Sequence, residues 1–187
     1  MKEKTTQNML EGSELLQQDQ FDKARESYKQ ILQGEPDNLE ALFGMGLIYQ
    51  HKHQYAEAKQ AFEKALKLDG RNTSILNRLG VVCAHLGDHD LAKSWFEKAI
   101  AIDSNLTDSY KNLAEICIAS GDFEKGVNTY LEILKNNPHD TETLLNMAGL
   151  YACIEDLEST QVLLKKVIEI DPENSIANES LEDLSEK

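Results

Sequence analysis

Apolar residues recur along the chain at spacings of three and four, and this pattern itself returns every 34 residues. Between positions 39 and 72 it forms two faces separated by a polar break: Leu42, Met45 and Tyr49, then Ala58, Phe62, Ala65 and Leu66. Spacings of three and four place side chains on one face of an α-helix. Each unit of 34 residues therefore predicts two amphipathic helices joined by a turn.

The unit occurs five times in register. Steps of 34 residues from Gly46 reach Gly80, Ala114 and Ala148, and a step back reaches Gly12. The pattern predicts five repeats without insertion or deletion, at residues 5–38, 39–72, 73–106, 107–140 and 141–174. Residues 1–4 then form an N-terminal extension. Residues 175–187 continue the first-helix pattern alone, which predicts a capping helix with one apolar and one polar face.

Glycine marks both the turns and the helix crossings. Gly87-Asp88 and Gly121-Asp122 stand at the turn inside two repeats, where glycine can end one helix in the left-handed conformation and aspartate can cap the next. The other three repeats have weaker turn formers, but their phase is unbroken. The small residues at Gly46 and its equivalents should lie where the two helices cross, because a larger side chain would push the axes beyond about 8–10 Å.

These features resemble the tetratricopeptide repeat, which places an aromatic or Leu, a Leu-Gly pair and a Tyr on one helix, and Ala, an aromatic and Pro on the next. Pro36, Pro138 and Pro172 hold the proline position, and Gly70 and Ser104 replace proline in the other two repeats. The resemblance covers about nine-tenths of the chain. It implies an all-α, right-handed α-solenoid of five helix-turn-helix units plus a C-terminal capping helix. It also implies a protein-binding scaffold without catalytic chemistry.

The chain carries a net charge of −14, and the charge is unevenly distributed. Residues 39–72 sum to +1, whereas residues 141–174 sum to −5 and residues 175–187 to −3. An acidic chain without a basic stripe is repelled by phosphate backbones, so nucleic acid and anionic membranes are unsuitable partners. We expect a protein or peptide partner that is neutral to basic overall, and we keep self-association as an alternative.

The sequence also indicates a compartment. No segment approaches the ~20 apolar residues of a membrane span, and the N-terminal residues lack the apolar part of a signal peptide. The three cysteines form no CxxC pair, and Cys83 and Cys117 occupy the tyrosine position of the repeat, which should be buried. An odd number of thiols, two of them buried, fits a reducing compartment. We therefore expect a cytoplasmic protein without direct membrane insertion.

In the tetratricopeptide family the first helices line a concave surface, and positions 2, 5, 6, 9, 12 and 13 of each repeat point into it. The resemblance implies a partner-binding groove on this face, formed by Phe43, Leu47, Asn77, Arg78, His85, Lys111, Asn112, Glu115 and Asn146. Phe43 and Leu47, together with Met9 and Leu10, would form an apolar floor. Contiguous exposed apolar surface often marks a partner site.

Asn112 and Asn146 share position 6 of successive repeats, and Arg78 holds that position in the repeat before. Superhelical members of the family have an asparagine ladder here, because an amide can both donate to and accept from a peptide backbone. The resemblance suggests that the two asparagines hold an extended segment while Arg78 and Lys111 select a nearby carboxylate. Two solvated asparagines without a partner are the alternative.

The sequence gives no support for catalysis or for a resident ligand. The clamp with which some family members bind acidic chaperone tails is absent, because Glu115 replaces its second Asn and Ile176 and Ser180 replace its basic pair. His85 and His89 lie on either side of a Gly-Asp break, so they do not share a helix face as metal ligands would. No P-loop, dinucleotide fingerprint, GxSxG or HExxH motif occurs. We expect no enzyme activity, no cofactor and no metal site.

The combined prediction is a non-catalytic scaffold or adaptor that binds a peptide or protein segment in the concave groove. The alternative is a self-assembling scaffold or regulatory subunit of a bacterial complex, similar to magnetosome-associated and pilus-assembly repeat proteins. Sizing the purified protein over a range of concentrations separates the two, because only the second associates with itself.

Overall fold

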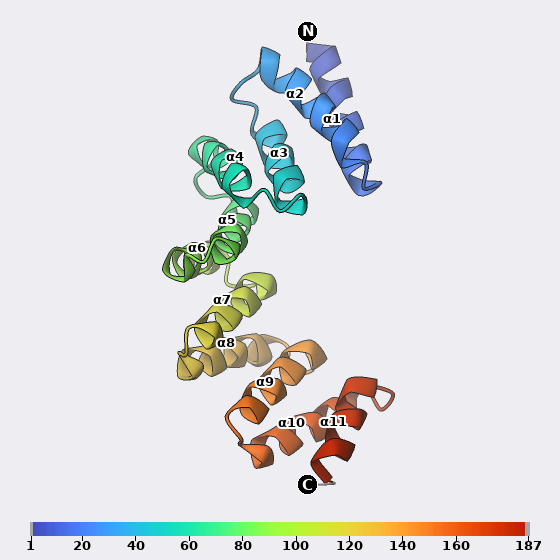
Figure 1. Cartoon of the computed structure of the whole chain (residues 1–187), viewed down its shortest axis with the longest axis vertical. Helices are drawn as coiled ribbons and strands as arrows, with labels where there is room; N and C mark the ends of the chain where they lie inside the picture. Colours follow the sequence, from blue (N-terminus) through green and yellow to red (C-terminus); the bar gives the residue numbers. More distant parts are fainter. Residues whose placement is uncertain (1, 186–187) are drawn as a thin grey trace. The chain divides into compact units, whose positions relative to one another are not determined.

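The structure, a computed structural model, describes residues 2–185, which form eleven α-helices and no strand (Figure 1). The helices are α1 (Lys2–Gln17), α2 (Phe21–Gly34), α3 (Leu39–His51), α4 (Tyr55–Leu68), α5 (Thr73–His85), α6 (His89–Ile102), α7 (Thr107–Ala119), α8 (Phe123–Asn136), α9 (Thr141–Cys153), α10 (Leu157–Ile170) and α11 (Ser175–Ser185). The prediction of an all-α fold is confirmed. Residue 1 of the predicted extension and residues 186–187 of the predicted cap lie outside the described residues.

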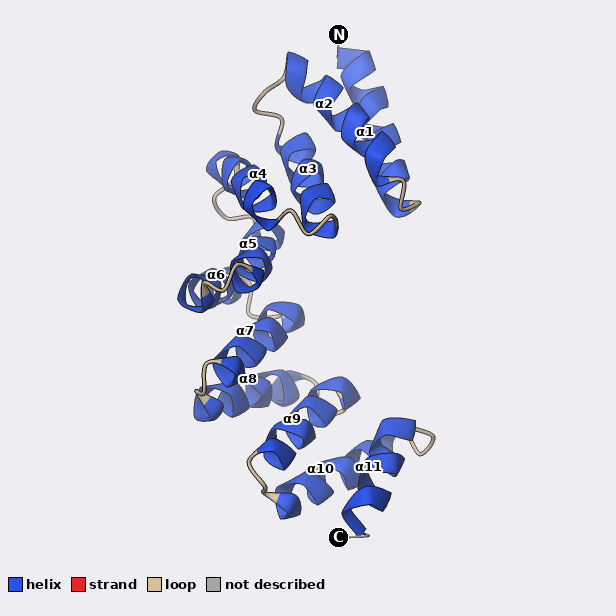
Figure 2. Ribbon diagram, viewed as in Figure 1, coloured by secondary structure: helices blue, strands red, loops and turns tan. Residues whose placement is uncertain are grey.

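Short connections of two kinds alternate along the chain. Figure 2 shows them as tan loops between blue helices: three residues join the helices within each pair, and four residues join one pair to the next. The second residue of every three-residue turn has a left-handed backbone, at Asp19, His53, Gly87, Gly121 and Glu155. The amide after it donates to a carbonyl five residues back, for example Asp88 N to Cys83 O at 3.0 Å. This Schellman motif explains how each first helix ends.

Side-chain caps start most of the helices. Asn38, Asn72 and Asp140 are the last residues of four-residue connections, and each accepts a hydrogen bond from the backbone amide three residues later. Asp88 and Asp122 do the same at the end of the predicted Gly-Asp turns, which confirms that part of the sequence analysis. Each cap pairs an amide that the first helical turn would otherwise leave unsatisfied.

The chain divides into two compact units, Met1–Leu106 with α1–α6 and Thr107–Lys187 with α7–α11. In each unit the two helices of a pair pack on one another and the second helix packs on the following first helix. The division falls between the third and fourth predicted repeats. Each unit therefore has its own buried core.

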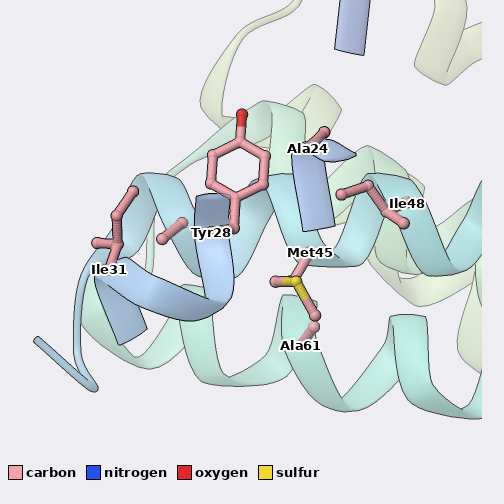
Figure 3. Packing of buried hydrophobic residues seen from close by; sticks show 7 residues of the cluster. Ala24, Tyr28, Ile31, Met45, Ile48 and Ala61 are labelled. Carbon is pink, nitrogen blue, oxygen red and sulfur yellow. The ribbon is translucent and has the colours of Figure 1, made fainter. Parts of the chain in front are cut away.

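Tyr28 shows how one pair is joined to the next in the first unit. Its side chain is 2% exposed and packs with Ile31 on its own helix and with Met45 and Ile48 on α3 (Figure 3). Burial raises the pKa of Tyr28 to about 12, with a further contribution from the charge of Glu40. The tyrosine thus stays neutral and closes the junction between α2 and α3.

Glycines lie against the aromatic rings of the second helices, as expected at the helix crossings. A Cβ atom built on Gly46 would lie 2.4 Å from the Phe62 ring, and one on Gly80 would lie 2.4 Å from the Phe96 ring. Gly44 of α3 faces the ring of Tyr28 on α2, and a Cβ atom built on it would lie 2.5 Å from that ring. Real Cβ atoms do not approach a ring so closely, so these contacts require glycine.

None of the described helices is long and apolar enough to cross a membrane.

Replacing Gly80 with alanine should destabilise the protein, because the new methyl group overlaps the buried Phe96 ring. Overpacking of this kind commonly costs about 1–3 kcal/mol. The matched control is Gly149→Ala in α9, where an added Cβ meets nothing within 4 Å. The control should gain up to about 1 kcal/mol from helix propensity. Urea unfolding measures both, and equal stabilities of the two variants would contradict the crossing.

Replacing Glu155 with glycine should stabilise the protein. Glu155 has φ = 60° in its turn, a conformation that costs a residue with a Cβ about 1–2 kcal/mol. Glycine removes this strain and loses about 0.4–1 kcal/mol through its more flexible unfolded chain. We expect a net gain of roughly 0.5–1 kcal/mol in urea unfolding, whereas the reverse change Gly121→Ala should lower the stability. A less stable Glu155→Gly variant would contradict the strain.

Candidate functional site

A cavity of about 440 Å³ in the first unit contains three of the predicted groove residues. Leu47 comes from α3, and Arg78 and His85 come from α5, so two successive first helices form the cavity, as the sequence analysis expects. Residues at the end of α3, in the turn after it and at the start of α4 complete the lining: Gln50, His51, His53 and Tyr55.

Stacked rings fix the walls of this cavity. The Tyr55 and His85 rings lie 4.4 Å apart, centroid to centroid, with an angle of 7° between their planes. His53 Nδ1 lies 2.8 Å from the Tyr55 hydroxyl, so one of these two groups donates a hydrogen bond to the other. His51 stacks on Phe21 of the first repeat at 3.5 Å. Stacking and hydrogen bonding restrict the rotamers of all these rings, which pre-organises the cavity for a ligand.

Two polar groups of the cavity have no partner within the described residues. Gln50 Oε1 is buried and accepts no hydrogen bond. Leaving such an acceptor unpaired costs about 1–3 kcal/mol, so a ligand that donates to it recovers part of that energy. Arg78 is exposed and forms no ion pair with any described residue. A carboxylate is the group that its planar guanidinium pairs with best.

The other predicted groove residues of the first unit contribute less to an open surface. The Phe43 ring is half-buried and lies 5.6 Å from the Phe62 ring, and Leu47 packs against the same core cluster. Asn77 is half-buried and interacts with other residues of the chain. Of the predicted apolar floor, Leu10 is 55% exposed. Most of the floor therefore belongs to the core.

The second unit carries Asn112, Asn146 and Glu115. Both asparagines are half-buried, Glu115 is exposed, and Asn112 interacts with other residues of the chain. A small cavity of about 250 Å³ lies between α9 and α11 of this unit, and its lining includes Leu145 and Gly149. These two positions also belong to the concave face that the repeat pattern predicts.

Lys111 has partners that the sequence analysis did not foresee. Its ammonium lies 3.5 Å from Asp140 and also contacts Glu142, and its side chain is 14% exposed. Burial alone would lower the pKa of Lys111, but the hydrogen bond to Glu142 and the charge of Asp140 raise it. Burial likewise opposes ionisation of Asp140, yet its hydrogen bonds from Thr143 and the charge of Lys111 lower its pKa.

The Lys111 charge is therefore satisfied inside the protein. Both carboxylates surround an ammonium that is largely buried, so Lys111 has little capacity left to select a carboxylate on a partner. Sequence reasoning missed this because Asp140 and Glu142 are about 30 positions away. It also missed His53, which lies in the turn after α3, and Tyr55, which begins α4, because neither occupies a groove position. Among the described residues, no group of three or more His, Cys, Asp or Glu side chains could hold a metal ion.

Solved structures with the same fold cover most of this chain. A tetratricopeptide repeat protein from Parabacteroides merdae gives a TM-score of 0.85 at 18% identity, over 97% of this chain and 72% of the other. MamA from Desulfovibrio magneticus, residue 41 to the end, gives 0.83 at 19%, over 92% and 97%. YrrB, described as having an unusual peptide-binding site, gives 0.76 at 23%, over 94% and 90%. These similarities confirm the predicted all-α solenoid.

A sequence comparison with curated proteins gives no significant match. Models of the tetratricopeptide repeat, however, match residues 9–52, 37–105 and 71–137. The last two matches together cover residues 37–137, more than half of the chain. The predicted resemblance is thus confirmed: the chain belongs to the tetratricopeptide repeat family.

Proposed function

We propose that this chain is a non-catalytic scaffold that binds a protein segment on the face formed by its first helices. Tetratricopeptide repeats generally mediate contacts between proteins, and the solved structure of YrrB is described as containing a peptide-binding site. The observation that carries the proposal for this chain is the cavity around Leu47, Arg78 and His85. It combines an apolar contact, a cation without an ion pair and a buried acceptor without a hydrogen bond.

The chemistry of this cavity specifies the proposed partner segment. A carboxylate of the segment pairs with the Arg78 guanidinium, and a neighbouring apolar side chain contacts Leu47. A backbone N–H or other donor of the segment satisfies Gln50 Oε1. The partner as a whole is neutral to basic, since the chain carries a net charge of −14. Cys83 and Cys117 are buried and form no disulfide bond, which supports a reducing, cytoplasmic location for the scaffold.

The second unit carries its own proposed binding residues, Asn112 and Asn146. Their amides lie at equivalent positions of two successive first helices, α7 and α9. In this proposal each amide hydrogen-bonds the backbone of an extended segment, which gives affinity without side-chain specificity. Lys111 stabilises the junction between α7 and α9 through Asp140 and Glu142 and does not bind the partner.

Replacing Arg78 with glutamine should weaken partner binding about tenfold or more, because a hydrogen bond to a charged group contributes about 1.5–3 kcal/mol. The wild-type chain serves as bait for affinity capture, and calorimetry then measures the affinity of each captured protein. The matched control is Arg71→Gln, which removes the same charge from an exposed loop outside the cavity. A captured partner whose affinity falls equally in both variants, or in neither, would refute the role of the cavity.

Replacing Asn112 and Asn146 with alanine should weaken the binding of the same partner, with a loss of about 0.5–1.5 kcal/mol of binding free energy for each hydrogen bond removed. The melting temperature should change little, because neither side chain belongs to a buried core cluster. Calorimetry and thermal unfolding of the double variant test both expectations. Unchanged affinity would show that the asparagines do not bind the partner, and a large fall in melting temperature would show that they stabilise the fold.

A further inference from the structure

A second cavity of the first unit lies between the second helices α4 and α6, away from the groove residues that the family pattern predicts. It measures about 730 Å³, and its lining is largely apolar. Leu66 of α4 and Trp95 and Ile102 of α6 supply the large side chains, and Lys67 and Lys98 stand on its two helical walls. The spacing from Trp95 to Ile102 corresponds to two helical turns, or about 10 Å, enough to hold part of another helix.

The residues that create this cavity are exceptions within the repeat. Gly70 stands where three other repeats have proline, and an added Cβ there would meet only the Leu66 carbonyl oxygen at 3.7 Å. Trp95 is the only tryptophan of the chain. The equivalent residues in the other repeats are smaller: Ser27, Ala61, Thr129 and Leu163. The scaffold therefore does not require this combination, which points to a local role.

The lysines of the cavity are available to an acidic group. Lys98 Nζ lies 4.2 Å from the centre of the Trp95 ring, so the indole face holds the ammonium at the cavity. Neither Lys67 nor Lys98 forms an ion pair with any residue in the described range 2–185. Glu63 is the one carboxylate in the lining. Repeat two, which contains Lys67, is also the only repeat with a positive net charge.

The chain itself carries a complementary surface on α11. Ile176 is 60% exposed, and with Asp183 it is among the residues that line the cavity between α9 and α11. Glu179 and Asp183, both exposed, follow Ile176 at spacings of three and seven, so the three side chains share one helical face. Residues 175–187 carry a net charge of −3. Capping the last repeat therefore leaves this face of α11 uncovered, with an apolar side chain beside two carboxylates.

We propose that the cavity between α4 and α6 binds α11 of a second copy of this chain. Ile176 of the second copy packs on Leu66 and Trp95, and Glu179 and Asp183 pair with Lys98 and Lys67. The two surfaces are different, so the contact is heterologous and joins copies head to tail. A single short helix buries little area, which makes the association weak and reversible. This site is separate from the proposed peptide-binding cavity, and either proposal can fail alone.

Trp95 provides a direct probe, because all tryptophan fluorescence of the protein comes from this site. Over a concentration series from ~1 µM to ~1 mM, sedimentation should show growing assemblies, since this range spans weak protein association. Over the same range Trp95 emission should shift to shorter wavelength as Ile176 excludes water. Added salt should reverse both changes, because it screens the paired charges.

Charge reversal identifies the two surfaces. The cavity variant Lys67→Glu/Lys98→Glu and the helix variant Glu179→Lys/Asp183→Lys should each associate at least about tenfold more weakly than wild type. An equimolar mixture of the two should assemble again, because each cavity then meets a helix of opposite charge. The control Lys64→Glu/Lys93→Glu makes the same charge change on α4 and α6 outside the lining and should behave as wild type. Circular dichroism verifies that all variants fold.

Three results would overturn the proposal. The first is a wild-type chain that stays monomeric with constant Trp95 emission over the whole series. The second is association that the cavity variant and the control reduce equally, or a mixture that fails to assemble. The third is a monomeric chain whose Trp95 emission responds instead to an added carboxylate such as laurate, which would assign the cavity to a small amphipathic ligand.

Discussion

The contact between a glycine and an aromatic ring at the helix crossing is the constraint on which the rest of the first unit depends. Phe62 and Phe96 fit against α3 and α5 only because Gly46 and Gly80 have no side chain. The Tyr28 ring, on α2, contacts Gly12 of α1 in the same pair and Gly44 of α3 in the following pair. One ring therefore sets both the packing within a pair and the distance to the following pair. In a solenoid, where repeats bury apolar surface only against their neighbours, these contacts replace a central core.

The left-handed turn is the second constraint, and it is obeyed even where the sequence suits it poorly. Gly87 and Gly121 adopt it without cost, whereas Asp19, His53 and Glu155 adopt the same conformation with a side chain. Packing on both sides of the turn outweighs the local strain, since losing the crossing would cost more than the turn does. The unbroken period predicted this outcome. The left-handed backbone at the three other positions is visible only in the structure.

The sequence predicted the scaffold well because the apolar residues that recur every 34 positions are the same residues that the fold buries. The helices begin and end where apolar spacing, Gly-Asp turns and polar caps indicate, and Cys83 and Cys117 are buried as their repeat position suggests. The site was predicted less completely. Leu47, Arg78 and His85 do meet around one cavity, but Lys111 is held by two carboxylates and Phe43 contributes mainly to the core. A position in the repeat gives the direction of a side chain and not its contacts.

The residues with distinctive chemistry lie at positions whose side chain the 34-residue pattern does not specify. His53 lies in the turn after α3 and Tyr55 begins α4, and their rings, held by stacking and a hydrogen bond, form a wall of the cavity around Arg78. Gly70 and Trp95 differ from the residues that other repeats have at their positions. Gly70 has no side chain and Trp95 has a large one, and together they leave the apolar surface between α4 and α6 uncovered. Five repeats with the same crossings and turns need not share a function. Because each repeat supports its neighbours through a few fixed positions, single substitutions elsewhere can give one junction a binding surface without changing the stability of the others.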